Sequence, residues 1–303
     1  MTAGDCGYLL LSSKFGDPDR KPLTTAQMRI VAQRAAYLPL VNSGEELTLE
    51  HLLSAGVEKQ LAEKILKLLE DTLQLKAYLS KARRAGCTPI TRASRAYPLA
   101  LRRRLGLEAP GCLWAKGNLD ILSMPTVSLV GSRMLQGENR QFARMVGIQA
   151  ALQGYALVSG NARGADTVAQ DACLEAGGYV VSVLADSLSE HCPDTHRLYM
   201  SEDDYDECFS VPRALHRNRV IHCLSDKVFV AQCTLGKGGT WDGSTQNLRR
   251  GWSSVYCFRD GSPASVALEQ MGAFLIDTEM LADLKSLPQR QPNLFHKIGR
   301  AHV

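Results

Sequence analysis

The chain has 303 residues, of which 45% are hydrophobic and 22% charged, and its formal net charge is +4. This composition is typical of a globular protein with a large apolar core, and it excludes a chain that is wholly disordered, collagen-like or coiled-coil. No apolar run approaches the roughly 20 residues that a membrane span needs, so we do not expect a membrane protein. The length fits one large or two ordinary domains, and we start from two.

Basic residues are concentrated in one stretch of the chain. Between positions 81 and 104 there is no acidic residue, and the basic ones are Lys81, Arg83, Arg84, Arg92, Arg95, Arg102, Arg103 and Arg104. The small net charge does not by itself indicate a nucleic-acid partner. The stretch fits either a solvated helix face followed by a loop or a surface for an anionic partner, and the sequence leaves both open.

The nine cysteines are scattered, without the spacing of a zinc site, and the seven histidines match no metal motif. We therefore expect free thiols in a reducing compartment, with no metal and no cofactor. The N-terminus has no basic segment before its short apolar run, so we expect no signal peptide and a cytoplasmic location.

Residues 1–122 are expected to form a helical N-terminal domain that ends in the basic connector. Apolar positions recur at helical spacing over residues 25–38 and 57–79, and a short helix opens near Leu47. The stretch 54–69 has a glycine between helical patterns, which predicts a small SAM-like or helix-hairpin-helix-like domain. A plain turn in a helical bundle is the alternative.

Residues 123–278 are expected to form a Rossmann-like domain, because short β-branched runs alternate with amphipathic helices. The expected strands are 126–130, 156–158, 179–184, 227–231, 254–258 and 273–276. The expected helices are 138–152, 165–176, 211–224, 242–250 and 264–270. This alternation produces βαβ crossovers, so the predicted fold class is α/β with a doubly wound, mostly parallel sheet.

Residues 279–303 are expected to be a tail, because the apolar pattern weakens toward Pro288 and Pro292. The last six residues, 298–303, resemble the translation of a common sequencing-adapter oligonucleotide. We therefore expect this end of the chain to be truncated or artefactual, with a further C-terminal domain missing.

Three glycine-bearing segments each follow an expected strand and come before an expected helix. They are residues 131–133, 159–166 and 236–240. The carboxyl ends of parallel strands lie at one edge of the sheet, where α/β proteins bind ligands. Glycine allows close backbone approach, and a helix N-terminus offers free N–H groups with a partial positive charge. Arg133, Arg163 and Lys237 add formal charge, so we predict phosphate binding at this edge.

Motifs for other chemistries are missing from the sequence. There is no Walker A sequence and no GxGxxG fingerprint, which disfavours ATP hydrolysis and NAD chemistry. There is also no GxSxG nucleophile elbow, and we expect no catalytic residue. Asp166 is expected to hold the glycine loop around it. His216 and His222 are expected to be surface or packing residues.

The order of the glycine segments resembles the DNA-processing protein A family, also called DprA or Smf. The resemblance covers about residues 45–275 and rests on Gly131-Ser132-Arg133, the SGNARGAD run that begins at Ser159, Gly177-Gly178, and Arg217-Asn218-Arg219. It implies an extended Rossmann domain that binds single-stranded DNA and hands it to the recombinase RecA during natural transformation, a form of recombination in competent cells. It also implies a homodimer and no covalent catalysis.

The loop chemistry and the resemblance together predict the residues that bind nucleic acid or phosphate. They are Gly131, Ser132, Arg133, Ser159, Gly160, Arg163, Gly164, Arg217, Asn218, Arg219, Lys237, Gly238, Gly239 and Thr240.

Some positions depart from the family pattern and leave two other functions open. Residues 238–244 read GGTWDGS where the family usually ends this segment in Thr-Ala, and Ala169-Gln170 replaces the usual Ala-His pair. The first variant is similar to a branch of the same superfamily that senses nucleotide signals in phage defence. It is more distantly similar to phosphoribohydrolases, in which Asp242 would replace a catalytic Glu, although a helix cap is the simpler interpretation. Trp241 is a candidate for stacking on a base.

Overall fold

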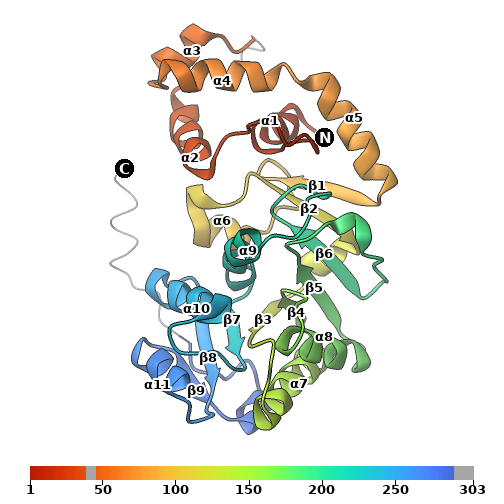
Figure 1. Ribbon diagram of the computed structural model, residues 1–303, viewed down its shortest axis with the longest axis vertical. Helices are drawn as coiled ribbons and strands as arrows, with labels where there is room; N and C mark the ends of the chain where they lie inside the picture. Colours follow the sequence, from red (N-terminus) through yellow and green to blue (C-terminus); the bar gives the residue numbers. More distant parts are fainter. Residues whose placement is uncertain (39–45, 290–303) are drawn as a thin grey trace. The chain divides into compact units, whose positions relative to one another are not determined.

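The computed structural model describes residues 1–38 and 46–289. The chain divides into two compact units, which we describe separately. Unit 1 comprises residues 1–117, 186–192 and 200–209, and unit 2 comprises residues 118–185, 193–199 and those from 210 onward. The strands follow the order β1-β2-β6-β5-β4-β3-β7-β8-β9 (Figure 1). The fold class is therefore α/β, as the sequence predicts.

Unit 1 is largely helical. Its helices are α1 (Ala3–Ser12), α2 (Thr25–Arg34), α3 (Leu49–Ser54), α4 (Lys59–Leu69), α5 (Thr72–Arg84) and α6 (Leu99–Leu105), with 3-10 turns at Ala35–Tyr37, Gly106–Glu108 and Leu188–Glu190. The first three helices begin at capping boxes formed by Thr2, Thr24 and Thr48. The buried face of α4 comprises Leu61, Ala62, Ile65 and Leu68, whose spacing follows the helical period.

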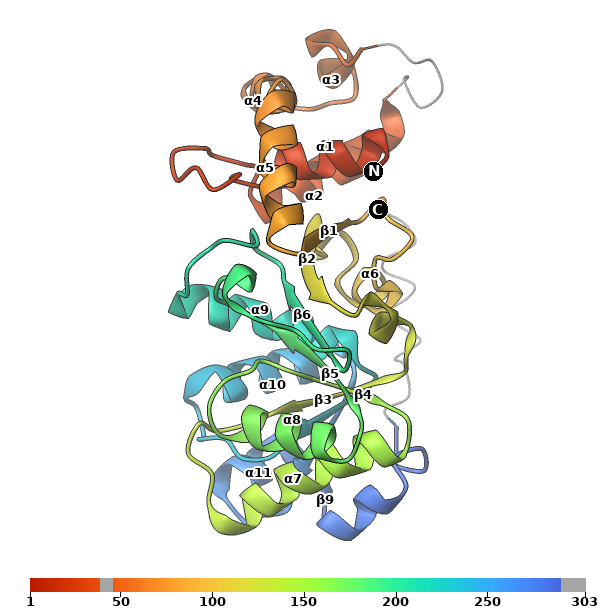
Figure 2. The same ribbon diagram turned by 90° about the vertical axis from the view of Figure 1, so that its right-hand side faces the viewer.

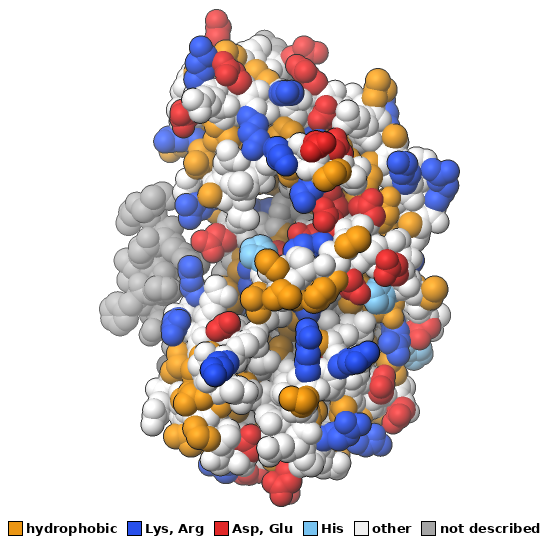
Figure 3. All heavy atoms as spheres, viewed as in Figure 1, with side chains coloured by type: hydrophobic (Ala, Val, Ile, Leu, Met, Phe, Trp, Pro, Cys, Tyr) orange, Lys and Arg blue, Asp and Glu red, His pale blue; other side chains and the backbone are white. Residues whose placement is uncertain are grey.

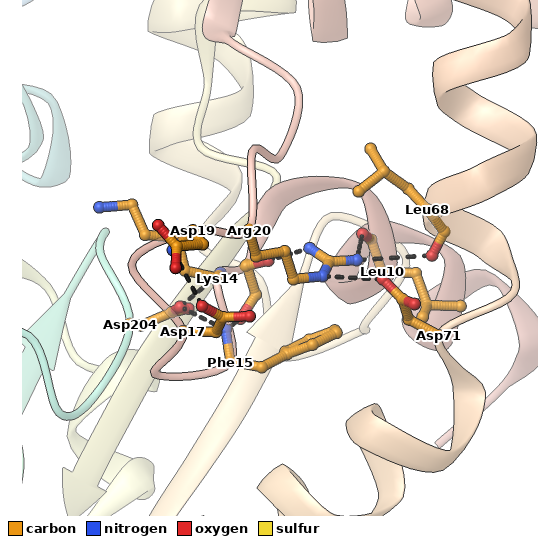
Figure 4. A network of polar contacts seen from close by, with 10 residues as sticks. Leu10, Lys14, Phe15, Asp17, Asp19, Arg20, Leu68, Asp71 and Asp204 are labelled. Atoms are coloured by element: carbon orange, nitrogen blue, oxygen red, sulfur yellow. Dashed lines mark hydrogen bonds and ion pairs between the residues drawn. The ribbon is translucent and has the colours of Figure 1, made fainter.

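A buried arginine ties the helices of unit 1 together (Figure 4). The guanidinium of Arg20 donates from Nε to Asp71 at 3.0 Å and from Nη2 to the Leu10 carbonyl at 2.7 Å, and it lies over the Phe15 ring. Asp204 accepts from the backbone N–H of Lys14 at 2.7 Å. A buried guanidinium is tolerated when its donors are satisfied in this way, so Arg20 fixes the loop after α1.

The structure differs from the sequence-based expectation at several places in unit 1. The helical pattern over 57–79 is interrupted, because α4 ends at Leu69 and α5 begins at Thr72. Helix α2 likewise ends at Arg34 and continues only as a 3-10 turn. Strands β1 (Cys87–Thr91) and β2 (Cys112–Gly117) form an unexpected antiparallel pair. Strand β1 contains Pro89, which indicates a loop in sequence but is compatible with a strand at the edge of a sheet, where β1 lies.

Unit 2 alternates strands and helices. The strands are β3 (Thr126–Val130), β4 (Ala156–Ser159), β5 (Tyr179–Val183), β6 (Arg197–Ser201), β7 (Lys227–Val230), β8 (Ser254–Phe258) and β9 (Phe274–Ile276), β6 ending in unit 1. The helices are α7 (Gly137–Leu152), α8 (Ala165–Glu175), α9 (Val211–Leu224), α10 (Gly238–Arg250) and α11 (Pro263–Gln270), with 3-10 turns at Leu119–Ser123 and Thr278–Ala282. The six strands expected here are confirmed. Strand β6 was not expected, because its run Arg197–Ser201 contains no β-branched residue.

The strands from β5 through β4, β3, β7 and β8 to β9 are parallel neighbours. The chain runs outward from β3 in one direction through β4 and β5, and in the other through β7, β8 and β9. The doubly wound, mostly parallel topology is thus confirmed. Its switch point lies between β3 and β7, and a ligand is expected at the carboxyl ends of these two strands.

Helices cover both faces of this sheet, and the side chains of β3 show why. Val127 and Leu129 pack in one core cluster with Phe142 of α7 and Ala169 of α8. Ser128 points to the opposite face, where its hydroxyl donates to the Ile221 carbonyl of α9 at 2.7 Å. Alternate residues of a strand face opposite sides, so α7 and α8 cover one face and α9 the other (Figure 2).

The described part of the expected tail packs against unit 2. Leu281, Leu284 and Leu287 are buried in the same core cluster as β3. The sequence did not indicate this because polar and charged residues separate the leucines from the last strand and from one another. The rest of the tail, residues 290–303, lies outside the described residues. All nine cysteines are free, and none of the described helices is long and apolar enough to cross a membrane.

Candidate nucleic-acid interface

Four segments of unit 2 meet at the carboxyl ends of β3, β4 and β7, and we call them the glycine edge. They are residues 131–133 after β3, residues 159–166 between β4 and α8, residues 217–219 in α9, and residues 237–240 at the start of α10. All fourteen residues that the sequence predicts for phosphate or nucleic-acid binding lie in these four segments.

Hydrogen bonds join the segment after β3 to two of the others. The Thr240 hydroxyl donates to the Gly131 carbonyl at 3.1 Å. The N–H of Ala165 donates to the Ser132 carbonyl at 3.1 Å. The segment therefore lies between the start of α8 and the start of α10, and it is fixed by both.

Glycine is required where these segments touch. A Cβ atom on Gly131 would lie 2.5 Å from the Cβ of Ala165. Gly164 has a φ of +90°, and a Cβ there would lie 2.5 Å from the carbonyl oxygens of Ser132 and Arg133. Contacts this short do not occur between real side chains and backbone, so a larger residue at either position would separate the segments.

Asp166 holds the loop between β4 and α8. Its buried carboxylate accepts from the N–H groups of Gly160 at 3.0 Å and Ala162 at 3.2 Å. Burial raises the pKa of Asp166 to about 6, while the nearby Arg217 guanidinium and the two N–H donors oppose that rise. The sequence-based expectation that Asp166 holds this loop is confirmed.

Arg217 lies inside the protein and supports the same loop. Its side chain is 6% exposed, and its guanidinium donates to the carbonyls of Val183 and Ala214. A Cβ atom on Gly160 would lie 2.1 Å from Nη1 of Arg217. The missing side chain of Gly160 therefore makes room for the guanidinium, and Arg217 positions the loop while its charge stays below the surface.

Three other cations of the glycine edge stand in solvent. Arg133, Arg163 and Lys237 are exposed. Within residues 1–38 and 46–289, none of the three side chains forms an ion pair with a carboxylate, although Arg133 is near enough to lower the pKa of Asp166. Arg219 is half-buried on α9, and Ser159 is buried, where its hydroxyl accepts from Gln170. The surface charge of the edge thus comes chiefly from the three exposed cations.

Helix α10 begins earlier than the sequence predicts. It starts at Gly238, with Lys237 as N-cap and no side-chain hydrogen bond to the first turn, so Gly238, Gly239 and Thr240 are helical. The Asn218 amide donates to the Gly239 carbonyl at 3.2 Å, which joins α9 to this turn. Helix α8 likewise lacks a side-chain cap at its N-terminus. Two uncapped helix N-termini therefore add partial positive charge to the edge.

Two exposed apolar side chains border the cations and were missed by the sequence reasoning. Leu215 of α9 is 46% exposed, and a Cβ on Gly239 would lie 3.1 Å from its Cδ2. Met134, next to Arg133, is 85% exposed. Apolar side chains gather over α9 in the space-filling view (Figure 3). The sequence feature that could have identified them is an apolar residue between or beside basic residues, as in the run 213–219.

Three other residues in this region were singled out in the sequence: Asp242, Trp241 and His222. Asp242 lies in the second turn of α10 and is exposed, so the cap that we expected it to form is wrong, because the helix begins at Gly238. Trp241 is half-buried. His222 is fully buried, with Nδ1 3.1 Å from the Asn247 amide, and burial lowers its pKa to about 4. It is a packing residue. No cluster of three or more metal-ligating side chains occurs in the described part of the chain.

The glycine edge combines exposed cations, two helix N-termini without side-chain caps, and flanking apolar side chains on a backbone held by internal contacts. Cations and N–H donors bind phosphate oxygens, and apolar side chains contact bases or sugars. The arrangement therefore suits an anionic, base-bearing ligand.

Comparison with known proteins identifies the family of this chain. A family model described as DNA recombination-mediator protein A matches residues 88–247, which is 160 of the 303 residues. The DNA processing protein DprA of Streptococcus pneumoniae is 33% identical over 144 residues, which are 43% of this chain and 50% of that protein. Protein Smf of Escherichia coli is 32% identical over 145 residues, which are 43% of this chain and 38% of that protein. The matches thus span half or less of these curated relatives.

Solved structures match over more of the chain. The X-ray structure of DNA processing protein A from Streptococcus pneumoniae has a TM-score of 0.70 and 26% identity, and the match covers 91% of this chain and 95% of that one. A DNA processing protein A structure from Helicobacter pylori has a TM-score of 0.52 and 21% identity, covering 63% of this chain and 90% of that one, and shows the shared fold. Because this family model matches more than half of the residues of the chain, the chain belongs to the DNA recombination-mediator protein A family.

Proposed function

We propose that the glycine edge binds the backbone of single-stranded DNA. The observation that carries the proposal is the set of three exposed cations, Arg133, Arg163 and Lys237. They form no ion pair with a carboxylate in the described chain, and they lie on separate segments. Single-stranded DNA presents phosphates at regular intervals. Several separated cations therefore suit single-stranded DNA better than they suit one mononucleotide.

Further observations support this ligand. Leu215 and Met134 place exposed apolar surface beside the cations, and bases of a single strand are free to contact such surface. The Helicobacter pylori protein, which shares this fold, is described as having a single-stranded DNA binding mode. Binding in this proposal involves no covalent catalysis.

The biological role follows from family membership and is part of the proposal. Curated relatives are named as DNA processing proteins, and we propose that this chain delivers bound DNA to a RecA-type recombinase in natural transformation. The role implies a cytoplasmic location, and a homodimer as the working form.

A nucleotide sensor is the second candidate, because the uncapped N-termini of α8 and α10 lie on adjoining segments and suit one phosphate group. A labelled oligothymidine titrated with the protein, followed by fluorescence anisotropy, separates the two. DNA binding predicts tight association at low salt, and nucleoside mono- and diphosphates would leave the melting temperature unchanged. Stabilisation by a nucleotide without oligothymidine binding would contradict the proposal, and release of free base from nucleotides would indicate an N-glycosidase.

Two variants make the experiment specific to the glycine edge. Replacing Arg133 and Lys237 by alanine removes two exposed charges, and we call this the edge variant. Replacing Arg249 and Arg250 by alanine removes two exposed charges from the last turn of α10 and is the matched control. We expect the edge variant to bind oligothymidine more weakly than the wild type and the control to keep the wild-type affinity. Equal affinities for the two would refute the proposed site.

A further inference from the structure

The basic stretch at residues 81–104 belongs to unit 1, whereas the glycine edge belongs to unit 2. Part of it forms one local surface on the turn after β1 and on α6, which we call the arginine face: Arg92, Arg95, Leu99, Arg102 and Arg103.

Contacts within this surface hold its parts together. The Arg102 guanidinium lies 5.7 Å from the centre of the Tyr97 ring and donates to the Arg92 carbonyl at 2.5 Å. Arg92 in turn donates to the Leu107 carbonyl at 3.4 Å. The Tyr97 hydroxyl donates to the Pro110 carbonyl at 2.7 Å. Helix α6 and the turn before it are therefore fixed to each other.

The charge of the arginine face is not neutralised within the protein. Arg95, Arg102 and Arg103 are exposed, and across residues 1–38 and 46–289 none of them forms an ion pair with a carboxylate. Other arginines of unit 1 do form such pairs: Arg20 with Asp71 at 3.0 Å, and Arg29 with Glu108 at 3.8 Å. Like charges on one short helix repel each other, so an external anion would stabilise this arrangement.

An apolar side chain accompanies the charges. Leu99 is 60% exposed and lies three and four positions before Arg102 and Arg103, so the three share one face of α6. Guanidinium groups bind phosphate oxygens in pairs of hydrogen bonds, and an adjacent apolar side chain offers contact to a sugar or base.

We propose that the arginine face is a second surface for the phosphate backbone of single-stranded DNA. The proposal rests on the proposed function of the glycine edge, because it assigns the same class of ligand to a separate surface. It gives a function to the exposed arginines of the basic stretch.

The test replaces Arg95 and Arg103 by alanine, which we call the face variant. Neither side chain has a hydrogen bond or ion pair in the described chain, so the fold should be unaffected, and an unchanged melting temperature checks this. Affinity for a long oligothymidine is measured across a salt series for the wild type, the face variant, the edge variant and the Arg249/Arg250 control.

Each phosphate neutralised on a single strand contributes about 0.7 to the slope of log affinity against log salt, so we expect the face variant to lower the slope by about 1.4. The control should keep the wild-type slope. A face variant with the same slope and affinity as the control would overturn the inference, and weaker binding by the edge variant would then leave the proposed function standing. If the edge variant binds like the control, the proposed function fails instead.

Discussion

The packing of Arg217 beneath Gly160 gives a sharp prediction for the substitution Gly160→Ala. The added methyl group would lie 2.1 Å from Nη1, 2.7 Å from Cζ and 2.8 Å from Nη2 of the guanidinium. All three distances are well inside van der Waals contact. The guanidinium is held by the Val183 and Ala214 carbonyls, so it cannot move without losing hydrogen bonds.

The magnitude follows from these two effects. Forcing an extra methyl group into a packed interior costs about 1 to 3 kcal/mol. Breaking one hydrogen bond of a buried charged group costs about 1.5 to 3 kcal/mol more. We therefore expect Gly160→Ala to lower the free energy of unfolding of unit 2 by about 2.5 to 6 kcal/mol, and to weaken oligothymidine binding because the loop that carries Arg163 moves.

Urea unfolding followed by tryptophan fluorescence measures this effect, since Trp241 and Trp252 belong to unit 2. Gly137→Ala is the matched control: no atom lies within 4 Å of its added methyl group, and Gly137 is the first residue of α7. The control should change stability by less than about 1 kcal/mol. A Gly160→Ala protein within about 0.5 kcal/mol of the wild type, with unchanged DNA affinity, would refute the packing argument.

Three further predictions use the same unfolding assay. Burial lowers the pKa of His222 from 6.5 to about 4. As the pH falls below 6.5, the imidazole of the unfolded chain is protonated before that of the folded protein. The stability that neutral His222 contributes above pH 6.5 is therefore lost as the pH falls toward 4. At pH 5 the loss should be about 2 kcal/mol, seen as the change in the difference between wild type and His222→Gln from pH 7 to pH 5. Asp166→Ala removes the carboxylate near buried Arg217 and should cost about 3 to 5 kcal/mol, whereas Asp166→Asn keeps an acceptor and should cost less. Thr240→Val removes the hydrogen bond to Gly131 and should cost about 1 kcal/mol.

Contrary results are equally clear. A wild-type minus His222→Gln difference that does not vary with pH would mean that the imidazole is accessible to protons in the folded protein. Other groups that titrate in this range, such as Asp204, are common to both proteins and cancel in the difference. Equal losses for Asp166→Ala and Asp166→Asn would mean that the two N–H bonds contribute nothing.

Much of unit 2 could be predicted from sequence because its signals are local. The runs at 126–130 and 254–258 are rich in β-branched and aromatic residues, and the helices between strands show regular apolar spacing. Strand β1 could not be recognised, because Pro89 indicates a loop. Its place at the edge of the sheet is what makes a strand compatible with this proline.

The candidate site was predicted in its residues and less well in its geometry. Parallel strands bring their carboxyl ends together, so the glycines and cations could be placed at one edge from sequence alone. Which cation is buried could not be predicted: Arg217 lies inside because Gly160 leaves room for it. The start of α10 was missed because two glycines disfavour a helix, and the contact between Asn218 and Gly239 is a tertiary one.

The salt dependence of oligothymidine affinity, compared between the wild type and the edge variant, tests the central claim most directly. Loss of the two exposed charges at Arg133 and Lys237 should make the slope of log affinity against log salt shallower by about 1.4, with weaker binding at every salt concentration. The Arg249/Arg250 control should retain the wild-type slope. An edge variant whose slope and affinity equal those of the control would contradict the assignment of the glycine edge as the surface that binds single-stranded DNA.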